Sequence, residues 1–289
     1  MDKSDFLYAL QAEASKFTAA VATESGDWII KGFIDIYKRV YTLSVDTKVV
    51  SKVLELLLYP AFVQFAEING FELQLSPQQN FYPDLTFVSR KTGVKFAVDI
   101  KSAYRTSETR INGMTLGAFT GYFRNRHSSK NTLHPYGQYS GHYVLGVIYS
   151  QAENSIDERK QYVLSELESI PSVIRSFQFF AQPKFRIASH LPGSGNTKNI
   201  GSISSINDLI NGSGPFASLG EEVYDDYWMY YLTADMARTI NVSDRPYSNL
   251  KTYVEYKQVG MTVLEAHAEE IRHLAEDEDT LAESEEGVI

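Results

Sequence analysis

The segment YPDLTFVSRKTGVKFAVDIKS, residues 82–102, decides the fold that we expect. It predicts a β-hairpin with arms over 85–88 and 94–100 and a turn over 90–93. In the second arm, Phe96 and Val98 alternate with Lys95 and Ala97, as in a strand with one buried face. A hairpin brings the start of its first arm beside the end of its second, so we expect Asp84 and Asp99 to converge.

Asp84, Asp99 and Lys101 are the candidate catalytic residues. Side chains alternate along a strand, so Ile100 should point away from the face that Asp99 and Lys101 share. Two adjacent carboxylates repel each other, and a divalent cation relieves that repulsion. Their hard oxygens suit Mg²⁺, for which we expect Mn²⁺ to substitute. A metal-bound water beside an ammonium group is suited to attack on a phosphodiester.

Each of these residues also has a surface interpretation. Asp84 could cap a turn after Pro83, and Asp99 and Lys101 could be a solvated pair at a strand edge. The apolar run before Asp99 favours the catalytic interpretation, because surface carboxylates rarely end a buried strand. Glu55 is a further candidate, although Ser51 and Lys52 share its side of the helix and slightly favour a solvated face.

The remaining pattern predicts one α/β domain with a mixed central sheet flanked by helices. We expect helices over 4–20, capped by Ser4, and from Asp46 or Thr47 to Gly70, with Pro60 kinking or interrupting the second. The other expected elements are strands within 27–43, a strand over 143–149, a strand pair within 177–188, a loop over 191–202 and a helix over 221–240.

The composition is that of a soluble protein, and its charge is unevenly distributed. Residues 261–289 hold ten acidic residues and one basic residue, which account for the whole net charge of −9. The other 260 residues therefore sum to zero, and we expect one folded domain over 1–250 and an acidic, partly disordered extension over 251–289. We expect no signal peptide or membrane-crossing run, and a cytoplasmic location fits the absence of cysteine.

Seven collinear segments resemble the EcoRV-like type II restriction endonucleases of the PD-(D/E)xK nuclease superfamily. They are DTKVVSKVLELLLYP, QQNFYPDLTF, AVDIKSAY, MTLGAFTGYFRN, HPYGQYSGHYVLG, GSGNTKNIGSI and DYW, between residues 46 and 228. The resemblance implies that Asp84 and Asp99 bind the metal, Lys101 is the catalytic lysine and Glu55 is an auxiliary carboxylate. It also implies a PD-(D/E)xK fold.

The resemblance further implies contacts with double-stranded DNA. The recognition loop, Gly193, Ser194, Gly195, Asn196 and Thr197, would read bases in the major groove, where Asn196 can bond bidentately to adenine. A second loop, Gln78, Gln79 and Asn80, would lie at the minor groove, with Asn80 contacting bases. Expected contacts to the DNA backbone come from Lys48, Tyr104, Thr115, Arg124, Lys198 and Asn199.

The implied reaction is blunt cleavage at the centre of GATATC, a palindrome that implies a homodimer with residues 18–45 as its dimerisation element. A methyltransferase of the same specificity would be the genetic partner. Three other functions stay open: a repair or recombination nuclease on the same fold, a catalytically silent DNA-binding protein, and a hydrolase of another substrate. The last leaves both polar loops without a role.

Overall fold

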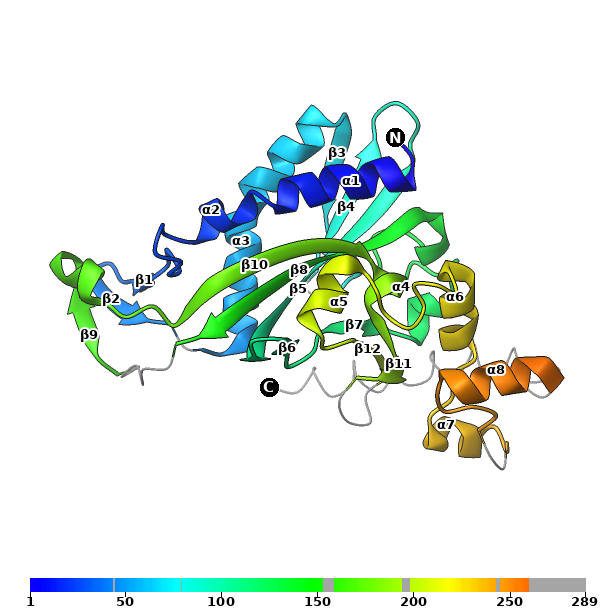
Figure 1. The fold of residues 1–289 in the computed structure, drawn as a ribbon. Coiled ribbons are helices and arrows are strands. Elements are labelled where there is room, and N and C mark those ends of the chain that lie inside the picture. Colours follow the sequence, from blue (N-terminus) through cyan, green and yellow to red (C-terminus); the bar gives the residue numbers. More distant parts are fainter. Residues whose placement is uncertain (44, 79, 153–158, 194–197, 243–244, 260–289) are drawn as a thin grey trace, which may run out of the picture.

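The expected hairpin lies at the centre of a mixed β-sheet (Figure 1). A computed structural model describes residues 1–43, 45–78, 80–152, 159–193, 198–242 and 245–259. The central sheet has the order β10-β8-β5-β4-β3, with β6 also paired to β5. Strand β5 runs parallel to β8, and the other neighbouring pairs are antiparallel. This arrangement, with helices on both faces, confirms the expected fold class.

The structure gives the elements the following bounds. The helices are α1 (Lys3–Ala14), α2 (Phe17–Val21), α3 (Thr47–Ile68), α4 (Lys184–Ile187), α5 (Ile206–Asn211), α6 (Glu221–Met229), α7 (Ala234–Thr239) and α8 (Leu250–Val259), with short 3-10 segments at Gly121–Phe123, Tyr136–Gln138 and Leu164–Ser169. The strands are β1 (Gly32–Ile34), β2 (Arg39–Thr42), β3 (Phe71–Leu75), β4 (Leu85–Ser89), β5 (Lys95–Ser107), β6 (Arg110–Ile111), β7 (Thr115–Ala118), β8 (Tyr139–Gln151), β9 (Gln161–Val163), β10 (Ile174–Pro183), β11 (Ala188–Pro192) and β12 (Asn199–Ser202).

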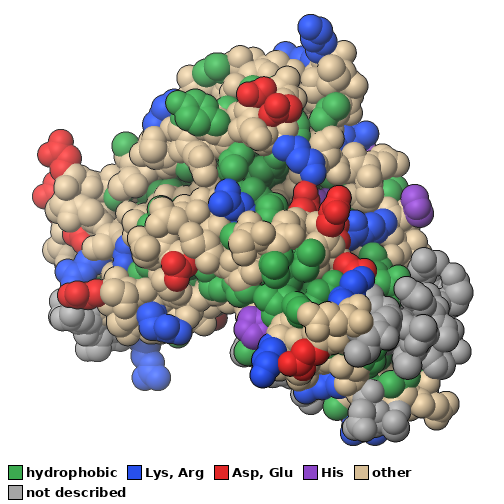
Figure 2. Space-filling model, turned by 45° about the vertical axis from the view of Figure 1, so that its right-hand side comes forward, with side chains coloured by type: hydrophobic (Ala, Val, Ile, Leu, Met, Phe, Trp, Pro, Cys, Tyr) green, Lys and Arg blue, Asp and Glu red, His purple; other side chains and the backbone are tan. Residues whose placement is uncertain are grey.

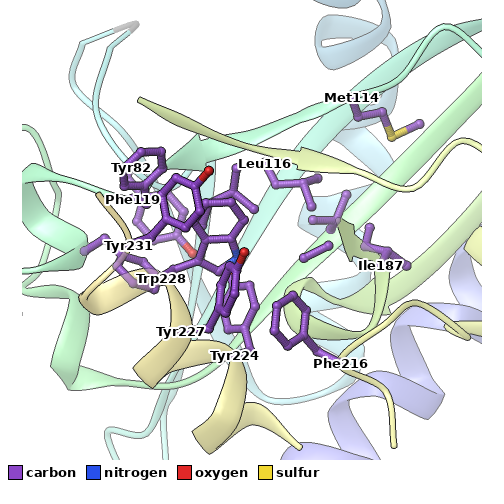
Figure 3. Packing of buried hydrophobic residues seen from close by; sticks show 14 of the residues in the cluster. Tyr82, Met114, Leu116, Phe119, Ile187, Phe216, Tyr224, Tyr227, Trp228 and Tyr231 are labelled. Carbon is purple, nitrogen blue, oxygen red and sulfur yellow. The ribbon is translucent and has the colours of Figure 1, made fainter. Parts of the chain in front are cut away.

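Two hydrophobic clusters cover the two faces of the sheet. On one face, α1, α2 and α3 bury a helix-side cluster that includes Phe6, Phe62 and Ile100. On the other face, the elements after β6 bury an aromatic C-terminal cluster, in which Phe119 stacks on Trp228 with ring centroids 5.2 Å apart (Figure 3). Because Ile100 belongs to the helix-side cluster, Asp99 and Lys101 project to the opposite face, as the alternation predicted.

Gly146 makes room for a large side chain directly behind the hairpin. It pairs with Lys101 on one side and with Phe180 on the other. A Cβ atom at position 146 would overlap the ring of Phe180, so only glycine lets that ring lie across β8. The packing of the sheet beside Lys101 therefore depends on the absence of a side chain here.

Helix α3 links the helix-side cluster to the surface near the hairpin. Asp46 caps it by accepting hydrogen bonds from the N–H groups of Lys48 and Val49, and the helix continues through Pro60 without ending there. By length and mean hydropathy, 22 residues and 1.5, this helix alone among the described residues could cross a membrane, contrary to our expectation. That is a weak indication, because it also packs in the protein core through Val50, Leu54, Leu58, Phe62, Phe65 and Ala66.

Two expected helices are each divided. The 4–20 segment forms α1 and α2, and Asp2, not Ser4, accepts the capping hydrogen bonds of α1. The 221–240 segment forms α6 and α7, because the hydroxyl of Thr233 accepts a hydrogen bond from Met236 N and starts a new helix. Local apolar spacing did not reveal either division.

The expected strand pair within 177–188 is wrong. This segment is the end of one strand, β10, followed by the single turn α4, and Pro183 separates them because it has no N–H to donate to the sheet. The expected loop over 191–202 is also shorter than predicted. Strands β11 and β12 flank it, and with β7 they form a small separate sheet.

The third sheet, β1-β2-β9, lies at one end of the molecule, at the left in Figure 1. It confirms the strands expected within 27–43. Large apolar side chains on and beside it are exposed to solvent: Phe33, Ile34, Ile36, Tyr37, Val163, Leu164 and Leu167. Ile36 is 89% exposed. This sheet therefore leaves an apolar surface uncovered in the single chain.

The first part of the expected extension is folded. Helix α8 packs on the C-terminal cluster through Tyr253, which is 3% exposed and donates a hydrogen bond to Asp226. Residues 260–289, which carry the acidic run, lie outside the described residues. On the face of the body drawn in Figure 2, acidic and basic side chains are interspersed, in keeping with a body of balanced charge.

We predict that Gly146→Ala lowers the free energy of unfolding by about 1–3 kcal/mol, because the added methyl group forces the Phe180 ring out of its place. Urea denaturation of the metal-free protein measures this loss. The double variant Gly146→Ala/Phe180→Leu should lose less than the sum of the two single variants. Strict additivity would mean that the ring does not fill the space over Gly146.

Candidate active site

The register of the hairpin brings Asp84 and Asp99 together. Leu85 pairs with Val98, which places Asp84 beside Asp99 in the next position of the ladder. The N–H of Asp84 donates to Oδ1 of Asp99 at 3.3 Å, and Oδ2 of Asp84 accepts from the N–H of Ile100 at 2.7 Å. Each carboxylate is therefore held by the backbone of the opposite arm.

Lys101 joins the two carboxylates. Its Nζ lies 3.6 Å from Oδ2 of Asp84 and 3.4 Å from Oδ2 of Asp99. Asp99 is buried, whereas the side chains of Asp84 and Lys101 keep 28% and 25% of their exposure. One edge of this group is thus open to solvent while the other is closed inside the protein.

The electrostatics of the group show two carboxylates that are not fully neutralised. The pKa of Asp84 is raised to about 6: burial is the main cause, the charge of Lys101 opposes the rise, and the charge of Asp99 adds to it. Burial acts to lower the pKa of Lys101, but the charges of Asp99 and Asp84 outweigh it and raise that pKa. Lys101 is therefore held as an ammonium, and Asp84 would be stabilised by a nearby cation.

The side chains of Asp84 and Lys101 line a cleft of about 1090 Å³. Its walls come from the first turns of α3, the 75–85 segment, the end of the hairpin and the β6–β7 region. Among its lining residues are several that the sequence singled out: Lys48, Glu55, Gln78, Asp84, Lys101 and Thr115. The cleft therefore gathers one side of the predicted DNA contacts around the predicted catalytic residues.

Glu55 faces the cleft but forms an ion pair with Lys52. Nζ of Lys52 lies 2.7 Å from Oε2 of Glu55, and the negative charge of Glu55 contributes to the raised pKa of Asp84. The described residues include no cluster of three acidic or histidine side chains that could hold a metal ion. The structure therefore does not bring Glu55 into one ligand set with Asp84 and Asp99, although all three side chains influence the same cleft.

The residues expected to contact DNA differ in their exposure to solvent. Lys48 and Thr115 are exposed at the cleft, and Asn80 is exposed in a turn that precedes Asp84. Tyr104 is half-buried and packs against the helix-side cluster. Arg124 is 3% exposed and donates to the carbonyl of Tyr231 inside the C-terminal cluster, so the prediction that it contacts the DNA backbone is corrected. Its burial could not be seen from a local sequence pattern.

Only the two ends of the predicted recognition loop can be described. The N–H of Gly193 donates to the carbonyl of Asn199 at 2.8 Å, and the N–H of Phe119 donates to the carbonyl of Lys198 at 2.9 Å. The ends of the loop are therefore anchored to each other and to the segment after β7. Gln79, Ser194, Gly195, Asn196 and Thr197 lie outside the described residues.

Two residues near the site were not singled out from the sequence. Lys52 lines the cleft and pairs with Glu55, and its position three residues before Glu55 was the signal that could have placed it there. Lys184 is 2% exposed behind the hairpin. Its apolar neighbours in FFAQPKFRI were the only local sign that this lysine is buried.

The residues present fit a hard divalent cation. Asp84 and Asp99 offer carboxylate oxygens at a site where burial and mutual repulsion leave negative charge to be neutralised. Mg²⁺ commonly takes one or two protein carboxylates and keeps water and substrate phosphate as its other ligands. Two carboxylates at the edge of a cleft large enough for a polymer backbone therefore suit this ion.

The chain is similar to restriction endonucleases. The family model described as restriction endonuclease EcoRV matches residues 24–258. The type II restriction enzyme EcoRV of Escherichia coli is 34% identical over 253 residues, which cover 87% of this chain and 95% of that protein. A solved structure of the NlaIV restriction endonuclease has 13% identity and a TM-score of 0.36 over 84% of this chain and 96% of that chain. The sequence matches, and not the structural one, carry the comparison.

We predict that Asp84→Asn changes the pH dependence of stability in the metal-free protein. The pKa of Asp84 is raised from 3.8 to about 6 in the folded state, so ionisation of this carboxyl destabilises the fold as the pH rises through that window. The parent should lose about 2 kcal/mol relative to Asp84→Asn between about pH 4 and pH 7. Urea denaturation across this range measures the difference.

Asp235→Asn is the matched control, because Asp235 has a 70% exposed side chain on α7. It removes a carboxylate without touching the candidate active site. A stability difference between Asp84→Asn and the parent that does not change between pH 4 and pH 7 would contradict the raised pKa of Asp84 and the crowding of charge that contributes to it.

Proposed function

The chain belongs to the EcoRV restriction endonuclease family and is therefore a DNA-hydrolysing enzyme; from this premise we propose that it is a Mg²⁺-dependent type II endonuclease that cuts GATATC at its centre and leaves blunt ends. The observation that carries this proposal is the convergence of Asp84, Asp99 and Lys101, of which Asp84 and Lys101 line one cleft. The same cleft presents Lys48, Lys52 and Thr115 as groups that can meet phosphates.

In the proposed mechanism, Asp84 and Asp99 hold the metal ion, and Mn²⁺ substitutes for Mg²⁺. When bound, the metal lowers the pKa of a water molecule and stabilises negative charge on the scissile phosphate. Lys101 is held in its charged form by both carboxylates, so it acts as a hydrogen-bond donor and a positive charge, not as a base. Its Nζ orients the attacking water and offsets the charge that develops on the phosphate oxygens.

Glu55 acts as an auxiliary carboxylate in this proposal. It is paired with Lys52, which also feels the charge of Asp84. A phosphate that enters the cleft would compete with Glu55 for the ammonium group of Lys52 and leave the Glu55 carboxylate free to face the metal site that Asp84 and Asp99 would form. The ion pair on α3 thus keeps Glu55 beside the site without placing three carboxylates together in the metal-free protein.

Sequence recognition is assigned to the two polar loops. The segment GSGNT, residues 193–197, contains glycines that allow close approach to base edges and an asparagine that can pair with adenine. The loop with Gln78 and Asn80 leads directly into Asp84, so contacts made there can position the catalytic carboxylate. The central TA step of the proposed site deforms readily, which favours readout through DNA bending. Lys198 adds a charge that can meet a phosphate.

A palindromic site suggests a two-fold homodimer in which each subunit cuts one strand. The exposed apolar surface of the β1-β2-β9 sheet supports residues 18–45 as the dimerisation element, because monomers seldom leave such a patch uncovered. We place the enzyme in the cytoplasm, where a methyltransferase of the same specificity would protect the host DNA.

Digestion of an unmethylated plasmid of known sequence tests the activity and its specificity together. With Mg²⁺ we expect discrete blunt ends at GATATC, and with EDTA we expect none. Asp99→Asn should lower the cleavage rate at least about 100-fold, since even changes around a metal's ligands cost about 10–100-fold. Asp235→Asn, on the exposed surface of α7, should cleave like the parent.

Discrete ends at another sequence would retain the enzyme class and discard GATATC as the site. A single altered base contact changes discrimination by about 1–3 kcal/mol, which is enough to shift a preference. Equal rates on perfect and mismatched duplexes would favour a repair nuclease. Full activity of Asp99→Asn would remove the hairpin from the catalytic role.

The dimer is tested by charge substitution on the exposed sheet. Phe33→Asp and Ile36→Asp should shift the sedimentation coefficient from that of a dimer to that of a monomer, because each buries a charge in the proposed interface. Tyr8→Asp is the control, since Tyr8 is also exposed, at 77%, but lies on α1 away from this sheet. A dimer that survives both substitutions would place the interface elsewhere.

A further inference from the structure

Lys184 is a buried cation that the proposed mechanism does not use. It stands at the first position of α4, directly after β10 ends at Pro183, and it is 2% exposed. Among the described residues, only Asp99, Arg124 and Lys184 are charged and buried. Arg124 has its place in the C-terminal cluster, whereas Lys184 lies in the field of Asp99 and Lys101.

The ammonium group of Lys184 lies against the segment that carries Asp84. Its Nζ is 4.3 Å from the ring centroid of Tyr82 and 5.7 Å from that of Tyr136. Gly117, with φ of +104°, lies beside this group: a Cβ there would stand in van der Waals contact with Nζ, at 3.6 Å. Gly117 also lines the cleft, so Lys184 lies just beneath the floor of the active site.

The ring, the hydroxyl and the carbonyl of Tyr82 each have partners, and Lys184 contacts the ring as well. Its ring stacks on Tyr122 at 4.9 Å, and its hydroxyl shares a hydrogen bond of 2.7 Å with Nδ1 of His142. Its carbonyl accepts hydrogen bonds from the N–H of Leu133 and the hydroxyl of Thr132. Because Asp84 follows two residues later, the place of the Tyr82 ring sets the place of the catalytic carboxylate.

A buried ammonium group destabilises a protein unless its charge is compensated. Burial lowers the pKa of Lys184 to about 8, and the charge of Asp99 opposes that shift. Lys184 adds a second positive charge, besides that of Lys101, to the surroundings of Asp99 and Asp84. The cation–π contact with Tyr82 adds a second source of compensation.

We propose that Lys184 is a positioning residue for DNA cleavage, whose ammonium group clamps the ring of Tyr82 and so holds Asp84 in place beside Asp99. This inference rests on the proposed function, because it assigns Lys184 to the same reaction. It gives the catalytic centre a contribution from the end of β10, a part of the chain remote in sequence from the hairpin. Lys184 acts through Tyr82 and does not touch the DNA.

The test compares Lys184→Met, Lys184→Arg and the control Gln182→Met in single-turnover cleavage and in DNA binding with Ca²⁺ in place of Mg²⁺. Lys184→Met should cleave about 100-fold more slowly, because displacement of a catalytic group by about 1 Å costs that much, and should bind DNA like the parent. Lys184→Arg, which keeps the cation, should recover part of the rate. Gln182 is also buried and polar, but it bonds to the carbonyl of Ile210, so Gln182→Met should cleave normally.

Parental cleavage by Lys184→Met would overturn the proposal, and so would an equal loss of rate in Gln182→Met, which would reveal a general effect of core disruption. If Lys184→Met does not fold, Tyr82→Leu replaces it as the test. That variant keeps Lys184 but removes the ring beneath it, and it should lose the rate while retaining DNA binding. A parental rate in Tyr82→Leu would equally overturn the proposal.

A crystal structure of Lys184→Met separates this inference from the proposed function. The clamp requires the Tyr82 ring and the Asp84 carboxylate to shift from their places relative to Asp99, whether or not the parent cleaves DNA. Unchanged positions would overturn the positioning role. Absence of cleavage by the parent, with the shift observed, would instead reject only the proposed function.

Discussion

The pairing of β4 with β5 is the constraint on which the rest of the structure depends. A strand that slips by one residue exchanges its two faces, so the Leu85–Val98 register puts Asp84 next to Asp99 and keeps both away from the helix-side cluster. The register is secured because β5 also runs parallel to β8 in the centre of the sheet. The Phe180 ring lies over Gly146, the residue that pairs with Lys101. The candidate active site is thus a product of sheet packing.

The parts of the fold that follow local rules could be predicted from the sequence. The alternation along 94–100, the turn before it and the Asp46 cap of α3 each depend on residues close in the chain, and each is present. The divisions of two expected helices escaped prediction, since a cap such as Thr233 competes with apolar spacing that continues past it. The end of β10 at Pro183 escaped for a similar reason.

The candidate site was predictable only where its residues lie on the hairpin. Asp84, Asp99 and Lys101 occupy neighbouring positions of one local motif, so their convergence follows from strand geometry. Arg124 and Lys184 depend on contacts between segments remote in sequence. The apolar neighbours of Lys184 were a weak local sign of its burial, but nothing local distinguishes Arg124 from a cation on the surface. The resemblance placed Arg124 in a matching segment but could not supply the direction of its side chain.

Because the ends of the 193–199 segment are anchored, the sequence recognition proposed for this segment is structurally separate from hydrolysis. The N–H of Gly193 donates to the carbonyl of Asn199, and the N–H of Phe119 donates to the carbonyl of Lys198. The entropy cost of closing a loop grows slowly with its length. If this segment reads the DNA bases, as proposed, substitutions between its anchored ends change the target sequence without altering Asp84, Asp99 or Lys101.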